Sequence, residues 1–136
     1  MVFSYQLWKT AKEAVIEFCN SSNGNLVTTL NKDFFLTQRL YQVRKALESI
    51  PPKPLLKPEG KFDEQDLDDY LGYLDMIQYF VDKGILLPEN ADYNFGDFVK
   101  EAYKNRYIQP YIAHLPKDYK NPFSYFLKWG KRLSEK

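Results

Sequence analysis

A run of acidic side chains in the middle of the chain is the first candidate for chemistry. It reads Asp63-Glu64-Gln65-Asp66-Leu67-Asp68-Asp69, and closely spaced carboxylates are ligands that Ca²⁺ prefers. A calcium-binding loop also needs a glycine at its sharp turn and a distal bidentate glutamate, and neither follows at the required position. The same acids are favourable in the first turn of a helix, where they complement the helix dipole. We therefore expect a charged helix start here and no metal site.

The single cysteine and the single histidine, Cys19 and His114, have the residue types of a hydrolase nucleophile and base. Nothing around either residue resembles a nucleophile elbow or an oxyanion loop, and two ligands are too few for a zinc site. The six glycines have neither phosphate-loop nor dinucleotide-binding spacing. We therefore expect Cys19 to be a small buried residue, His114 to lie at the surface or an interface, and the protein to have no cofactor and no enzyme activity.

Basic and aromatic residues alternate near the carboxyl-terminal end, over residues 117–132. Proteins that bind single-stranded nucleic acid use cations for the backbone and rings for base stacking. Most of these rings follow the spacing of a helix core, and the cations cluster at one helix end, where they suit the dipole. We therefore prefer the structural explanation and keep nucleic-acid binding through Lys128, Lys131 and Arg132 as the alternative function.

Two predicted helices position the acidic run, within the stretch Asp63–Leu115. Apolar residues recur at steps of three and four before Gly84, which ends the first helix. Pro88 or Asn94 begins the second. The predicted buried faces are Leu67, Tyr70, Leu71, Leu74, Ile77 and Val81 in the first helix, and Phe95, Phe98, Val99, Ala102 and the stem of Arg106 in the second. We expect an antiparallel helical hairpin.

Three further helices are predicted around this hairpin. They run from Ser4 to Phe18, from Asn31 or Asp33 to Ser49, and from the Asn121-Pro122 start signal to Leu133. Leu26–Leu30 is predicted to be an extended connector or a single turn, and residues 51–60, with four prolines, a stiff loop. Predicted inward residues are Leu36, Leu40, Val43, Leu47 and Ile50 in the middle helix and Phe123, Phe126, Leu127 and Trp129 in the last. The fold class is all-α: a compact bundle of about five helices in a single domain, residues 1–136.

Charge is segregated along a chain whose net charge is only +1. Residues 59–101 contain 12 acidic and 3 basic side chains, whereas both flanking regions are basic. The acids either pair with the basic ends of the chain or form a face for a partner. We predict an adaptor or an inhibitor, of the kind that an immunity protein exemplifies, which covers a basic site of another protein. The candidate contacts are Asp63, Glu64, Asp66, Asp68, Asp69, Tyr73 and Asp75.

Composition limits the remaining possibilities. Aromatic residues make up 17% of the chain, which indicates a core filled by few large side chains, with a surplus that would suit a recognition surface. An exposed apolar seam would let two copies form a homodimer. The chain has no apolar run of signal-peptide or membrane-span length. The lone cysteine excludes an intramolecular disulfide, so we expect a cytoplasmic protein without membrane contact.

Several segments in order resemble a bacterial and phage family known as domain of unknown function 4760. They are the helix Phe35–Leu47, Tyr70-Leu-Gly-Tyr-Leu-Asp-Met-Ile-Gln-Tyr-Phe-Val-Asp-Lys-Gly-Ile-Leu, Tyr93-Asn-Phe-Gly-Asp-Phe-Val, and Tyr107-Ile-Gln-Pro-Tyr-Ile112. The resemblance covers about residues 33–112 and leaves both terminal helices outside. The chain departs from the family in Asp75, where glutamate is more usual, and in its long proline loop. The resemblance implies no site residues, because the family has no assigned chemistry.

Overall fold

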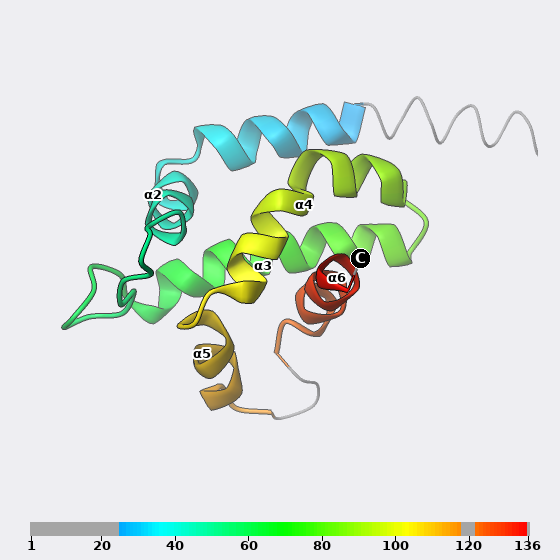
Figure 1. Cartoon of the computed structure of the whole chain (residues 1–136). Helices are drawn as coiled ribbons and strands as arrows, with labels where there is room; N and C mark the ends of the chain where they lie inside the picture. The colour runs from blue at the N-terminus through cyan, green and yellow to red at the C-terminus, as the bar shows by residue number, and fades with distance from the viewer. Residues whose placement is uncertain (1–24, 118–121, 136) are drawn as a thin grey trace, which may run out of the picture.

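The computed structural model describes residues 25–117 and 122–135, and within them every regular element is a helix (Figure 1). Six helical segments follow one another: residues 25–36, α2 (Gln38–Leu47), α3 (Glu64–Asp82), α4 (Pro88–Lys104), α5 (Ile108–His114) and α6 (Ser124–Ser134). The all-α class is confirmed; the described residues contain six helical segments where four of the about five expected helices fall. The helix predicted over Ser4–Phe18 lies outside the described residues.

Helices α3 and α4 run through the middle of the bundle, and the chain reverses between them (Figure 1). Asp63 caps α3 through a capping box with Asp66. Gly84 takes a positive φ of 74° after the end of α3, a conformation that a side chain would strain. The inward face of α3 is buried as expected except for half-buried Val81. In the second helix Phe98 is only half-buried, and the predicted burial of Arg106 is wrong, because this residue lies beyond α4 and is exposed.

The helix predicted as continuous from residue 31 or 33 to Ser49 is broken. Thr37 has extended backbone angles and separates residues 25–36 from α2. Leu26–Leu30 is helical rather than an extended connector or a single turn, because Leu30 and Phe34, one turn apart, are both buried in the core. Two residues of the predicted inward stripe, Leu36 and Ile50, are instead 72% and 96% exposed.

Aromatic rings fill the core where residues 25–36 meet α3 and α4. The buried ring of Phe34 lies 5.2–5.8 Å from the rings of five neighbours. Arg44 is only 7% exposed, and its guanidinium lies over four aromatic rings. The closest ring is that of Phe35, whose centroid is 4.6 Å from the guanidinium carbon. Much of the aromatic content therefore fills the core.

The proline-rich segment, residues 51–60, is folded against the core. Leu55 is buried at 3% exposure, and the backbone N–H of Phe62 donates to its carbonyl at 2.9 Å. Gly60 lies so close to this backbone that a Cβ atom there would be 2.3 Å from the carbonyl carbon of Leu55. The segment thus forms a fixed loop beside the start of α3, as Figure 1 shows at the left.

Helix α6 packs against both α3 and α4 (Figure 1). It begins at Ser124, after Phe123 in the left-handed conformation, and not at Pro122; the expected cap Asn121 lies outside the described residues. Phe126 and Trp129 are fully buried as predicted, whereas Phe123 and Leu127 are half-buried. Pro110 lies in the first turn of the short helix α5, since α4 has already ended at Lys104.

Candidate functional site

A groove opens between the proline-rich loop, the first turns of α3, and α5. Its volume is about 430 Å³, within the usual range of ligand pockets. Its lining is largely apolar and consists of Pro54, Leu55, Leu56, Glu59, Glu64, Leu67, Tyr107, Pro110, Tyr111, His114 and Leu115. The loop and the start of α3, which follow each other in the sequence, therefore build one concave surface with the distant helix α5.

Two tyrosines of α5 and its N-cap form one wall of the groove. Tyr107 and Tyr111 are four residues apart and so lie on the same helix face. The hydroxyl of Tyr111 donates to the carboxylate of Asp68 and lies 3.2 Å from the carbonyl oxygen of Glu64. Burial, followed by the bond to Asp68, raises the pKa of Tyr111 well above its usual value, so the hydroxyl stays protonated and remains a donor. This bond fixes α5 against α3.

Most of the acidic run is engaged within the protein. Asp63 and Asp66 exchange hydrogen bonds with each other's backbone N–H groups at 3.0 and 3.1 Å. The guanidinium of Arg39 contacts Asp66 at 3.2 Å and Asp69 at 2.7 Å. The hydrogen bonds from Arg39 and Gln65 hold the pKa of Asp69 below its usual value. These residues therefore stabilise the helix start before any partner is present.

The predicted contacts Tyr73 and Asp75 have their polar groups turned toward the protein itself. The hydroxyl of Tyr73 donates to the carbonyl of Leu30 at 2.9 Å, and burial raises its pKa to about 12. Asp75 accepts the backbone N–H of Phe126 at 2.8 Å, so it caps α6 from a neighbouring helix. Burial raises the pKa of Asp75 despite this bond.

Glu64 is the predicted contact residue that lines the groove with an exposed side chain. Glu59, from the loop, is a second exposed carboxylate in the same lining. Neither carboxylate has a hydrogen bond or an ion pair with another residue in the described part of the chain. Sequence reasoning missed Glu59, Tyr107 and Tyr111. The four-residue spacing of the two tyrosines was the available signal, but the position of the loop opposite them depends on the tertiary structure.

His114 also lines the groove, as the last residue of α5, and is exposed as expected. Cys19, its partner in the hydrolase hypothesis, lies outside the described residues. Among residues 25–117 and 122–135, no group of three or more histidine, cysteine or acidic side chains is placed to hold a metal ion. Nor does this part of the chain contain a helix of the length and apolarity needed to cross a membrane.

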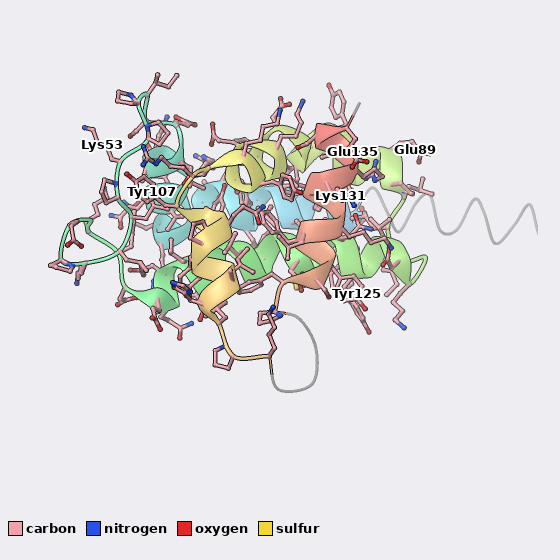
Figure 2. All side chains as sticks on the ribbon, turned by 60° about the horizontal axis from the view of Figure 1, so that its bottom comes forward. Lys53, Glu89, Tyr107, Tyr125, Lys131 and Glu135 are labelled. Atoms are coloured by element: carbon pink, nitrogen blue, oxygen red, sulfur yellow. The ribbon has the colours of Figure 1, made fainter. Side chains whose placement is uncertain are left out.

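Two of the three cations proposed for nucleic-acid binding are paired. Lys128 contacts Asp82 at 3.1 Å, and Arg132 forms a two-pronged bond with Asp92 at 2.8 and 2.9 Å. Lys131 is exposed and has no ion pair within the described residues. Figure 2 shows Lys131 on α6, far across the view from Tyr107 and Lys53 at the groove end.

A second, more polar cleft lies on the other side of the proline-rich loop. Its volume is about 620 Å³, and three lysines, Lys45, Lys53 and Lys61, contribute to its lining. Because Glu59 lines both hollows, the loop separates an acidic, apolar groove from a mainly basic cleft. The cleft differs from the groove in its three lysines, while Glu59 is shared by both.

The chain matches no protein-family model, no curated protein and no solved structure at a significant level. The resemblance to domain of unknown function 4760 stays a prediction. The geometry and charge of the groove are therefore the guide to function.

Proposed function

We propose that this protein is a non-enzymatic interaction module, an adaptor or an inhibitor, that binds a basic site of another protein with the acidic start of α3. The observation on which this depends is the pair of exposed carboxylates, Glu59 and Glu64, beside an apolar groove. Asp63 and Asp68 add negative charge to the same end of the helix. Apolar surface supplies affinity on binding, and complementary charge supplies orientation and association rate.

The residues that bind differ from the full acidic set predicted from the sequence. Tyr73 and Asp75 already hold other helices, so replacing them would disturb the fold together with any interface. Glu59 and Glu64 have no such structural bond within the described residues. They therefore provide the means of testing binding separately from folding.

The test is a pull-down with the full chain as bait, using Glu59→Lys/Glu64→Lys and a control with the same change in net charge. The control is Glu89→Lys/Glu135→Lys, since both residues are exposed and lie at the opposite end of the molecule (Figure 2). We expect a protein retained by the wild type and the control and lost from the groove variant. Its retention should weaken as salt is raised, because exposed charges are screened. A partner retained equally by both variants would contradict the proposal.

Nucleic-acid binding remains the alternative, and the exposed Lys131 is the observation that favours it. Lys131→Ala should then weaken binding to single-stranded DNA and reduce its salt dependence. Lys128 and Arg132 are poor probes by themselves, because their replacement also removes contacts to Asp82 and Asp92. No gel shift of DNA or RNA at low salt would exclude this alternative.

A further inference from the structure

The groove has the features of an anchor pocket for an apolar side chain. We infer that it binds a side chain of leucine or phenylalanine size from a partner segment that has arginine or lysine immediately beside it. This inference depends on the proposed function, since it specifies the kind of segment that the acidic end of α3 recognises.

The walls of the groove are already held in place. Pro54 and Pro110 are stiff residues on opposite sides. Tyr111 is fixed by its bond to Asp68, and the floor residues Leu55 and Leu67 are buried. A preformed apolar pocket needs little ordering when it binds, so an inserted side chain retains most of its burial energy. Anchors of this kind provide most of the affinity of many interfaces.

The charge at the groove selects the neighbours of the anchor. Glu59 and Glu64 are exposed carboxylates in the lining, and Asp68 lies just behind Tyr111. A segment with acidic residues beside its anchor would bring like charges together, which is unfavourable. Arginine or lysine at those positions would instead meet carboxylates that form no hydrogen bond or ion pair with the described residues. The occupant that fits is therefore apolar at its centre and basic on its flanks.

Four acetylated and amidated pentapeptides test this directly against the ¹⁵N-labelled full chain by NMR titration. Their sequences are Gly-Arg-Leu-Arg-Gly, Gly-Arg-Ala-Arg-Gly, Gly-Ser-Leu-Ser-Gly and Gly-Glu-Leu-Glu-Gly. We expect the first to shift the amide signals of Tyr107, Tyr111 and His114, with a Kd at least about 10-fold lower than that of any other peptide. No shift with any peptide at millimolar concentration would overturn the inference.

Two variants separate the anchor from the charge. His114→Trp adds bulk at the groove without removing a buried side chain. It should weaken the binding of Gly-Arg-Leu-Arg-Gly and of Gly-Ser-Leu-Ser-Gly by about 10-fold or more. Glu64→Gln should weaken only the arginine-flanked peptides. Both variants must have the helix content of the wild type by circular dichroism, so that a loss of binding is not a loss of folding.

The outcomes distinguish this inference from the proposed function. If the leucine and alanine peptides with arginine flanks bind equally, the inference of an apolar anchor is wrong, while the proposal of a basic partner is unaffected. Equal binding of the serine- and arginine-flanked leucine peptides would leave an apolar pocket but count against a basic partner. Self-association of the chain that His114→Trp abolishes would assign the groove to a second copy and also overturn the inference.

Discussion

The acidic residues at the two ends of α3 differ: Asp75 and Asp82 toward its carboxyl-terminal end hold α6, whereas exposed carboxylates remain beside its start. In its carboxyl-terminal half, Asp75 caps α6 and Asp82 pairs with Lys128, while Asp92 of α4 binds both Trp129 and Arg132. At its start, Glu64 and the neighbouring Glu59 border an apolar groove with no such partner among the described residues. Within one acidic segment, some carboxylates are thus paired with other helices of the protein, while others stay exposed at a groove.

The comparison shows why counting charges does not locate a binding face. Asp75, Asp82 and Asp92 each meet a donor supplied by α6, 37 to 51 residues away in the sequence. Glu59 and Glu64 lie beside apolar side chains instead. We expect Asp75, Asp82 and Asp92 to stabilise the fold, and we expect Glu59 and Glu64 not to.

The largest expected effect is that of Trp129→Ala at the α6 end. The change removes a fully buried ring and leaves a cavity, and it deletes the 2.8 Å bond to Asp92. We expect the free energy of unfolding to fall by about 3–5 kcal/mol, measured by urea denaturation followed by circular dichroism. The control Lys131→Ala, an exposed change on the same helix, should stay within about 0.5 kcal/mol. Equal effects would show that α6 is not docked as described.

Gly60→Ala should damage the groove end. Its Cβ atom would lie 2.3 Å from the backbone of Leu55, which cannot move away as a flexible side chain could. We expect a loss of about 1–3 kcal/mol in stability, together with loss of binding of the Gly-Arg-Leu-Arg-Gly peptide.

Gly72→Ala, within α3, is the matched control for this change, because the nearest atom that its Cβ would meet, Cε1 of Phe123, lies at an ordinary contact distance of 3.8 Å. Alanine is favoured over glycine inside a helix, so this variant should gain about 0.5–1 kcal/mol. A Gly60→Ala protein as stable as Gly72→Ala would show that the loop is not as tightly packed as described.

Removing one acid from each end gives the most direct comparison. Asp75→Ala leaves the N–H of Phe126 without its acceptor and should cost about 1–2 kcal/mol. Glu64→Ala should change stability by no more than about 0.5 kcal/mol, although it weakens partner binding. Thermal denaturation of the two variants measures the difference, and similar losses would contradict the division of roles.

The smallest effects concern pH. Burial raises the pKa of Asp75, so the part of its contribution that depends on protonation is complete below its unfolded pKa and is lost as pH rises through the higher folded value; the hydrogen bond from Phe126 is a separate contribution. The pKa of Asp69 is lowered mainly by its bond from Arg39, so its contribution is complete above its unfolded pKa and is lost as pH falls through the lower folded value.

NMR titration of the two side-chain carboxyl groups should find Asp75 protonated at higher pH than Asp69. In Arg39→Ala the pKa of Asp69 should move back toward its usual value while that of Asp75 stays unchanged. Stability should change little, as is typical of exposed ion pairs. The opposite order of titration would contradict the assigned environments.

The parts of the fold that could be predicted have local signals. The capping acids, Gly84 and Pro88 bound α3 and α4 through backbone chemistry that acts within a few residues. The break at Thr37 has no such signal, since neither glycine nor proline lies near it. The break lets both Phe34, before it, and Arg44, after it, reach the ring of Phe98 in α4. The helical spacing of Leu26, Leu30 and Phe34 was a signal for the earlier start, but the β-prone residues between them obscured it.

The candidate site was less predictable than the fold. Glu64 belongs to the recognised acidic run, but Glu59 belongs to a loop and Tyr107 to a helix start some forty residues further along the chain. Their juxtaposition depends on two interactions. The backbone N–H of Phe62 donates to the carbonyl of Leu55 and fixes the loop, and the hydroxyl of Tyr111 donates to Asp68 and fixes α5. Neither interaction has a sequence pattern. Residue types therefore indicated acidity at α3, and only the tertiary structure placed an apolar groove beside it.

The buried indole of Trp129 also provides an optical reporter. Because it is enclosed between α6 and α4 and bonded to Asp92, its fluorescence should be emitted at shorter wavelength than that of a tryptophan in water. The other tryptophan, Trp8, lies outside the described residues, and a Trp8→Phe protein would leave a single emitter. A shift of that emission toward longer wavelength would then time the release of α6 from the bundle, separately from events at the groove.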